Sequence, residues 1–302
     1  MHEILELLQR TGGPQDEQVL RRLRALAPTL TLGPAGAPAA VALDASDDNV
    51  AHRLVQRGWT ELAKAASPAT CRRLAFGVEA VLGAGLPGVF AYLFDEPWQL
   101  GEAMRARTSR ALGQPYVLVE DVWAFHVAPG QHGWPPHRGL VTPRLDRSVP
   151  EFLNVWVAVT DAPVDRACMH CVPLDDDPGY PRALERRDAQ LDAAQAMPVT
   201  AGTALAWNAN LLHWGGACSP SAGGPRASYT YSLCRADALA ALGVAQLRAE
   251  ELTLSDRVDV VARQIVTYGE GQADVSNAMI TWAKGLVLLR ETVTSLAGRK
   301  HP

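Results

Sequence analysis

The spacing of apolar residues divides the chain into three regions. In residues 1–113 apolar side chains recur at helical intervals, which predicts a mostly helical segment. Ser67 before Pro68 predicts an N-cap and a first helical residue, opening a helix through Leu82. The other apolar positions that support helices here are Ile4, Leu5, Leu7, Leu8, Leu20, Leu23, Leu26, Val50, Leu54, Trp59 and Leu62.

The pattern changes to short β-rich runs near Pro115. Strands are expected at 116–119, 122–127, 152–159, 199–207 and 228–234, separated by Gly and Pro turns. Such a series predicts a closed or double-sheet β architecture. Helical spacing then returns, with Ser255 as the expected cap of one helix and apolar positions 279–293 marking the last. We therefore expect one domain over 1–302, with helices at 1–113, a β core at about 115–237 and C-terminal helices at 238–302.

Composition narrows the class of protein. The 302 residues are 48% apolar and 20% charged, which is ordinary for a folded globular chain and argues against disorder. The net charge of -4 argues against a nucleic-acid partner, since such binders concentrate basic residues on one face. The acidic, amphipathic N-terminus does not resemble a signal peptide, and no apolar run is long enough for a membrane span. A cytoplasmic protein is expected.

Two short motifs favour structural interpretations. Cys168 and Cys171 form a C-x-x-C pair, but no second such pair occurs among the five cysteines, and the surrounding residues read as a buried strand. Asp175, Asp176 and Asp177 lack the alternating spacing of a calcium loop, so a solvated turn is expected there.

Two histidines and one arginine stand out as candidates for metal and anion binding. His137 lies in the run GWPPHRG at 133–139, and His213 lies in WNANLLHWGG at 207–216. Iron(II) oxygenases bind the metal through two histidines and a carboxylate, leaving positions open. Arg226 follows His213, and Ser228 shares its strand face, so a guanidinium and a hydroxyl could grip a carboxylate together.

Further residues are candidates for the same pocket. Asn154 shares a strand face with Trp156 and could bind a co-substrate, whereas Trp156 itself is expected in the core. His126 and His170 could line the pocket, although a structural role is equally open for His170 and favoured for His126. Trp207 could support His213.

The run from Trp123 to Arg235 resembles the bacterial phytanoyl-CoA dioxygenase-like oxygenases, which depend on iron(II), 2-oxoglutarate and O2. The resemblance is carried by GWPPHR at 133–138, NVWVAVTDA at 154–162, CMHCVPLDDDPGY at 168–180 and AGTALAWNANLLHWGG at 201–216. It implies an α+β protein with a double-stranded β-helix (jelly-roll, cupin-like) core. It also implies that His137 and His213 bind iron, while Arg226 with Ser228 holds 2-oxoglutarate.

Gly139 departs from the pattern of that family. The family motif ends H-R-D, and here glycine replaces the metal-binding aspartate. The related 2-oxoglutarate-dependent halogenases show this change and bind chloride or bromide in the open position, where an anion roughly preserves the charge of the site. A halogenase is therefore expected. A hydroxylase completed by water or Asp146, and a non-catalytic binding protein on the same fold, stay open as alternatives.

The expected partner is a small-molecule substrate. No carrier-protein domain is evident in the sequence, so a carrier-bound substrate is possible but not indicated.

Overall fold

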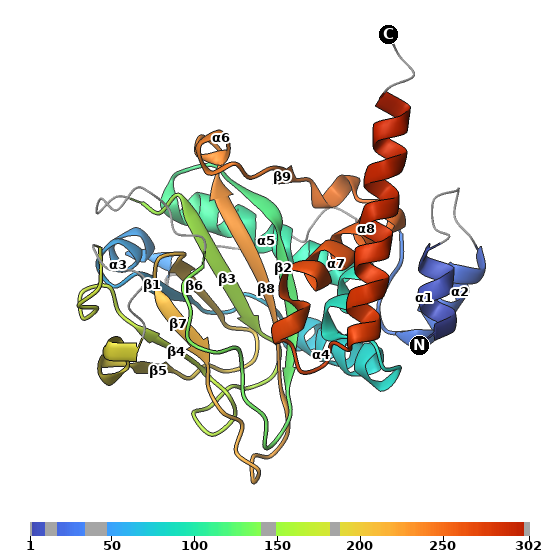
Figure 1. Ribbon diagram of the computed structural model, residues 1–302. Helices are drawn as coiled ribbons and strands as arrows, with labels where there is room; N and C mark the ends of the chain where they lie inside the picture. Colours follow the sequence, from blue (N-terminus) through green and yellow to red (C-terminus); the bar gives the residue numbers. More distant parts are fainter. Residues whose placement is uncertain (1, 10–16, 34–46, 140–148, 182–187, 299–302) are drawn as a thin grey trace.

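Two antiparallel β-sheets form the centre of the computed structural model, which describes residues 2–9, 17–33, 47–139, 149–181 and 188–298 (Figure 1). The larger sheet has the strand order β1-β6-β3-β8-β2-β9, and the smaller has the order β5-β4-β7. The strands are β1 (Trp59–Leu62), β2 (Tyr116–Val127), β3 (Phe152–Ala158), β4 (Met169–Val172), β5 (Gln195–Met197), β6 (Ala204–Asn208), β7 (Leu212–Gly215), β8 (Arg226–Arg235) and β9 (Gln246–Leu247).

Helices cover one face of the larger sheet. Among them α4, α5 and α7 contact β2 directly, while α8 packs on α7 (Figure 1). The α-helices are α1 (His2–Gln9), α2 (Glu17–Leu26), α3 (Val50–Gln56), α4 (Pro68–Gly83), α5 (Asp95–Leu112), α6 (Leu239–Leu242), α7 (Leu254–Tyr268) and α8 (Asn277–Gly298). Short 3-10 helices are η2 (Gly88–Leu93), η3 (Asp188–Ala193), η4 (Ala249–Glu251) and η5 (Gly269–Gly271).

Strand alternation decides which side chains meet the helices. On β8, Tyr229, Tyr231 and Leu233 belong to the core shared with the helices. Successive strand residues point to opposite faces, so Ser228, Thr230 and Ser232 face the other way, toward the smaller sheet. Apolar residues from both sheets meet there and form a second core, which includes Trp156, Met169, Leu205 and Trp207. The polar side chains of β8 therefore lie between the two sheets.

The structure corrects the expected helix around residue 59. Helix α3 ends at Gln56, and Trp59–Leu62 forms β1, which pairs with β6 at the edge of the larger sheet. Gly58 has a φ of 78°, a left-handed conformation that ends the helix and that other residues adopt with strain. The apolar spacing of Trp59 and Leu62 fitted a helix, but pairing with β6 decided the conformation.

Several other boundaries differ from expectation. Helix α7 begins two residues earlier than Ser255 implied, because Thr253 is its cap and exchanges hydrogen bonds with Asp256 in a capping box. Strands β5, β7 and β9 were not expected from the sequence. The helix through residue 82, by contrast, is confirmed: Ser67 accepts a hydrogen bond from the Thr70 amide at its start.

The two motifs expected to be structural have different outcomes. Cys168 and Cys171 are free thiols buried at the small sheet, as expected. Asp175 and Asp176 lie in an exposed turn, as expected, but the Asp177 carboxylate is buried and lies 2.8 Å from the Arg138 guanidinium. An uncompensated buried charge is costly, and this pair ties the segment after β4 to the run that contains His137.

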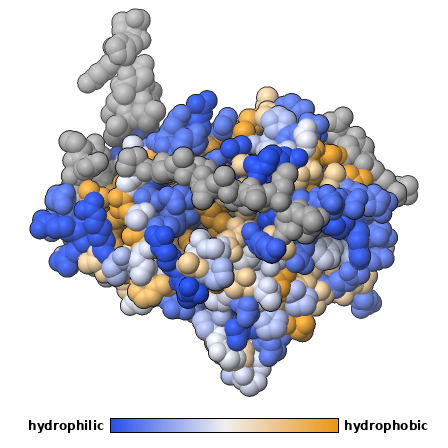
Figure 2. Space-filling view, turned by 180° about the vertical axis from the view of Figure 1, so that it is seen from behind, coloured by the Kyte–Doolittle hydropathy of each residue, from blue (hydrophilic) through white to orange (hydrophobic). Residues whose placement is uncertain are grey.

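The face seen from behind is mainly hydrophilic, with smaller apolar areas between (Figure 2). Among the described residues, Leu288 and Val164 are the most exposed large apolar side chains. Scattered residues of this kind are normal on a protein surface. Within the described segments, none of the helices combines the length and apolar character that crossing a membrane requires.

Candidate functional site

Two histidines are brought face to face by a backbone bridge. The amide of His137 donates to the His213 carbonyl at 3.0 Å, and the amide of His213 donates back to the His137 carbonyl at 3.0 Å. His213 lies on β7, and His137 lies in the loop beside it. Their ring centroids are 4.2 Å apart. Residues separated by 76 positions thus present two imidazoles to one point.

Backbone carbonyls set the tautomer of both rings. Nδ1 of His137 lies 2.8 Å from the Pro135 carbonyl oxygen, and Nδ1 of His213 lies 2.9 Å from the Leu211 carbonyl oxygen. A carbonyl only accepts, so each Nδ1 carries the proton and each ring presents the lone pair of Nε2. Burial, with His137 beside it, holds the pKa of His213 well below 6.5. A neutral imidazole with its Nδ1 hydrogen-bonded is the form that binds metal ions.

Gly139 follows His137 by two residues and lines a cavity together with both histidines. Its amide donates to the Ala209 carbonyl at 2.8 Å. A Cβ atom at this position would lie only 2.9 Å from Asn154 Oδ1, so the Asn154 carboxamide occupies space that a side chain would need. Across the described residues, no group of three His, Cys, Asp or Glu side chains is close enough to hold a metal ion. Asp146, the alternative third ligand, falls outside the described residues.

Arg226 is a buried cation at the start of β8. Its side chain is 1% exposed; Nε donates to the Ala167 carbonyl at 3.1 Å and Nη1 donates to Ser228 Oγ at 2.8 Å. The rings of Phe125 and Trp156 flank the guanidinium, with centroids 5.9 and 5.4 Å from its Cζ. No acidic side chain pairs with it in the described part of the chain. Burial lowers its pKa to about 10, because the charged form loses its solvation.

A chain of hydrogen bonds fixes the orientation of Asn154. Tyr268 Oη donates to Asp121 Oδ1 at 2.9 Å, and Ser232 Oγ lies 2.6 Å from Asp121 Oδ2. An ionised carboxylate only accepts, so the Ser232 hydroxyl must donate to Asp121. Ser232 can then accept from Asn154 Nδ2, 2.8 Å away. This leaves Asn154 Oδ1 facing Gly139, buried and without a hydrogen-bond donor among the described residues.

These groups line one cavity of about 620 Å³ between the sheets. Of the residues proposed from sequence, His137, His213, Gly139, Asn154, Arg226 and Trp207 all line it. The Trp207 ring lies 4.7 Å from the ring of His213. Ser228 is not among the lining residues; its Oγ accepts a hydrogen bond from Arg226.

Two candidate pocket residues lie elsewhere. His126 is next to Phe125, a residue that lines the cavity, and alternation turns the His126 side chain to the opposite face of β2. His170 lies between Met169 and Cys171 of the inner core and stacks on Trp214, with ring centroids 5.5 Å apart. Burial lowers the pKa of both imidazoles. The structure therefore places neither histidine in the cavity.

Sequence reasoning missed much of the cavity wall. Trp134 lies in the GWPPHR motif, but the sequence assigned no role to it. Asp121 lies at a bulge of β2, where the four-residue step from Leu118 to Val122 pairs with a two-residue step from Leu233 to Tyr231 of β8. Extra residues in a strand re-aim side chains, and nothing in the sequence marks this bulge. Tyr268 comes from the end of α7, more than 140 residues later.

Solved structures with similar folds include a non-haem, α-ketoglutarate-dependent enzyme. The α-ketoglutarate-dependent epimerase SnoN from nogalamycin biosynthesis superposes with a TM-score of 0.51 at 20% identity, covering 64% of this chain and 82% of SnoN. AviO1 from Streptomyces viridochromogenes Tue57 superposes with a TM-score of 0.51 at 14% identity, covering 65% and 97%. At these identities the similarity establishes the fold class: antiparallel sheets with helices, as in 2-oxoglutarate oxygenases.

The family follows from the sequence model of phytanoyl-CoA dioxygenases (PhyH), which matches residues 48–225. The match spans more than half of the chain, and this protein belongs to the PhyH family. No curated protein gives a significant match to the sequence. The matched region contains both bridged histidines and ends one residue before Arg226.

Proposed function

We propose that this protein is an iron(II)- and 2-oxoglutarate-dependent enzyme that oxidises a C–H bond of a small organic molecule. His137 and His213 would hold the iron through Nε2. Arg226 and Ser228 would hold the distal carboxylate of 2-oxoglutarate. The two facing sheets support a double-stranded β-helix core for this site, and family membership supports the chemistry.

The main support for the proposal is the burial of Arg226 without an acidic partner among the described residues. A fully buried guanidinium without an acidic partner is expensive, and an anionic ligand would remove that cost. Its planar fork can donate two parallel hydrogen bonds to a carboxylate. Phe125 and Trp156 exclude water from around it, which strengthens the attraction. A dicarboxylate lying between Arg226 and the histidine pair fits this arrangement.

Each remaining group of the site has a definable task. Iron(II) with 2-oxoglutarate and O2 would supply the oxidising power. The Pro135 and Leu211 carbonyls keep both imidazoles in the metal-binding tautomer. Trp207 packs on His213 and limits rotation of its ring. Asn154 is held by Ser232 beside Gly139, where its carboxamide can contact a ligand of the metal.

Halogenation is the second candidate, and Gly139 favours it. The position lacks a carboxylate, and the described residues offer no acidic substitute next to the two histidines. A chloride or bromide ion could take that place and preserve the charge of the site. Hydroxylation with water or Asp146 as the third ligand is the competing outcome. The space beside Gly139 is narrower than the sequence implied, because Asn154 Oδ1 fills part of it.

The first experiment is anaerobic titration of iron(II)-loaded protein with 2-oxoglutarate, followed through the metal-to-ligand charge-transfer band. A saturable band is expected. Arg226→Met should weaken 2-oxoglutarate binding by about 100-fold, because a buried charge pair contributes roughly 2–5 kcal/mol. The matched control is Arg263→Met, which removes a partly exposed arginine bound to Glu120. A missing band in the folded wild type, or equal affinities in both variants, would contradict the proposal.

Chloride is added next to the same anaerobic complex. A saturable shift of the band would support halogenation, whereas a band that does not change when chloride is added would favour hydroxylation. Consumption of O2 and 2-oxoglutarate then separates an enzyme from a binding protein, which should be indifferent to O2.

The comparison with SnoN bears on the substrate class. SnoN has been solved in complex with Fe3+, alpha ketoglutarate and nogalamycin RO, covering 68% of this chain at a TM-score of 0.50. We propose a small molecule as substrate here too, bound in the cavity of about 620 Å³. A cavity of this size falls within the range of small-molecule sites.

A further inference from the structure

The cavity carries opposite charges at its two ends. Arg226 and Ser232 both lie on the inner face of β8, six residues apart, which is roughly 20 Å along a strand. Asp121 contacts Ser232, so its carboxylate lies at the end away from Arg226. Asn154, opposite Ser232 in the register, lies beside Gly139 of the metal-site loop.

Asp121 has hydrogen bonds but no counter-charge. Tyr268 Oη and Ser232 Oγ each donate to one carboxylate oxygen, and both are neutral groups. In the described portion of the chain, no Lys, Arg or His lies within ion-pair distance of Asp121. The adjacent Glu120 differs, because Arg263 binds both of its oxygens. Each Asp121 oxygen can accept another hydrogen bond.

Aromatic rings form the wall next to this carboxylate. The Tyr268 ring centroid lies 6.3 Å from that of Trp123 and 6.4 Å from that of Trp134. Trp134 in turn lies 6.2 Å from the His137 ring, so the wall runs from Asp121 to the histidine pair. Electron-rich ring faces attract organic cations, more strongly where water is excluded.

We propose that the substrate carries a positively charged amine, bound between Asp121 and the rings of Trp123, Trp134 and Tyr268. This inference rests on the proposed function, since it takes the cavity as the substrate site and names the class of substrate. The charge arrangement sorts two ligands within one cavity: Arg226 attracts the dicarboxylate and repels the amine, and Asp121 does the reverse. The aromatic wall between them leaves room for an apolar substrate body whose reacting carbon faces the histidines.

The test compares two probes that differ only in charge. Benzylamine, which is protonated at neutral pH, and benzyl alcohol are titrated by calorimetry into metal-free wild-type protein. The amine should bind at least about 10-fold more tightly, and added salt should reduce the difference. Equal affinities, or tighter binding of the alcohol, would overturn the proposal without any variant. A purely structural Asp121, holding only Tyr268 and Ser232, would give equal affinities.

Two variants then locate the preference. Asp121→Asn should abolish the advantage of the amine over the alcohol. The matched control Glu120→Gln removes the same charge from the neighbouring residue and should keep most of it. If both variants lose the preference equally, the general field of the cavity is responsible and the site at Asp121 is rejected.

The iron and 2-oxoglutarate titration separates this proposal from the proposed function. A normal charge-transfer band without amine preference would leave the oxygenase assignment standing and reject the amine. Amine preference without the band would reject the oxygenase and leave a cation-binding cavity.

Discussion

Gly139 and Asn154 form a pair in which one residue occupies space that the other leaves. The Asn154 carboxamide is fixed by Ser232 and cannot rotate without losing that hydrogen bond. Its Oδ1 would lie 2.9 Å from a Cβ at position 139, closer than such atoms approach in proteins. An aspartate cannot simply be restored at this position, because Asn154 must move first.

Gly139→Asp alone is therefore expected to destabilise the protein, whereas combining it with Asn154→Ala should make room for the aspartate side chain. The single variant should lower the free energy of unfolding by about 1–3 kcal/mol, the usual cost of overpacking. The double variant should recover part of that loss, since neighbouring residues couple. It should also bind iron(II) more tightly and lose any response to chloride.

This coupling is measured by chemical unfolding and metal titration. Both are applied to the wild type, the two single variants and the double variant. Additive losses of stability would show that the two side chains do not compete for space. A chloride response that persists in the double variant would show that the halide binds away from position 139.

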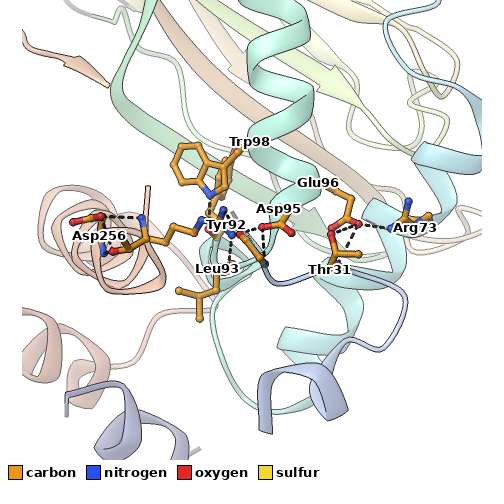
Figure 3. Close-up of polar contacts among 11 residues, drawn as sticks. Thr31, Arg73, Tyr92, Leu93, Asp95, Glu96, Trp98 and Asp256 are labelled. Carbon is orange, nitrogen blue, oxygen red and sulfur yellow. Dashed lines mark hydrogen bonds and ion pairs between the residues drawn. The ribbon is translucent and has the colours of Figure 1, made fainter. Parts of the chain in front are cut away.

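A cluster of polar contacts at the start of α5 holds three distant segments together (Figure 3). Glu96 accepts hydrogen bonds from the Thr31 amide and hydroxyl and pairs with Arg73 of α4. Asp95 pairs with Arg257 of α7 at 2.6 Å, and both side chains are buried. Helix α7 ends at Tyr268, so this anchor also positions one ring of the cavity wall.

Arg257→Gln should lower the free energy of unfolding by about 3 kcal/mol, because it leaves the Asp95 carboxylate buried and unpaired. The matched control lies on the same helix: Arg263→Gln breaks a partly exposed pair with Glu120 and should cost no more than about 1 kcal/mol. Urea unfolding of both variants provides the comparison. Equal losses would mean that the buried pair does not anchor α7.

Two half-buried histidines affect the stability of the whole molecule. Burial lowers the pKa of His126 and of His170 below the usual 6.5. Both side chains lie outside the cavity, so protonating them lowers the stability of the folded state. In the unfolded chain each would take up a proton near pH 6.5, while the folded protein resists protonation until the pH is lower.

The metal-free protein should therefore lose stability as the pH falls from about 7.5 to about 5.5, because the unfolded state binds more protons in that window. Asp259 and Asp274, whose pKa values burial raises, act in the opposite direction and only nearer the carboxylate range. Urea unfolding at several pH values measures the slope. The variant His126→Gln with His170→Gln should reduce this slope, and the part that remains comes from His213, whose pKa burial also lowers. A slope that is absent in wild type would refute the expectation.

The sequence by itself determined the parts that depend on local pattern. Short β-rich apolar runs located β2, β3, β4 and β8, and Ser67–Pro68 located the start of α4. Spacing of two also placed Arg226 and Ser228 on one strand face, as the hydrogen bond between them confirms. Motif resemblance pointed to the PhyH family, to which the chain belongs. These inferences succeed because strand periodicity and capping act over only a few residues.

Only the tertiary structure decided which distant groups meet. Pairing with β6 makes Trp59–Leu62 a strand, and neither His126 nor His170 lines the cavity. The tertiary structure also joined Asp121, Ser232 and Asn154 into one chain of hydrogen bonds and ended that chain at Gly139. Such contacts depend on strand register, a two-residue bulge and helix docking, all set by packing between segments far apart in sequence.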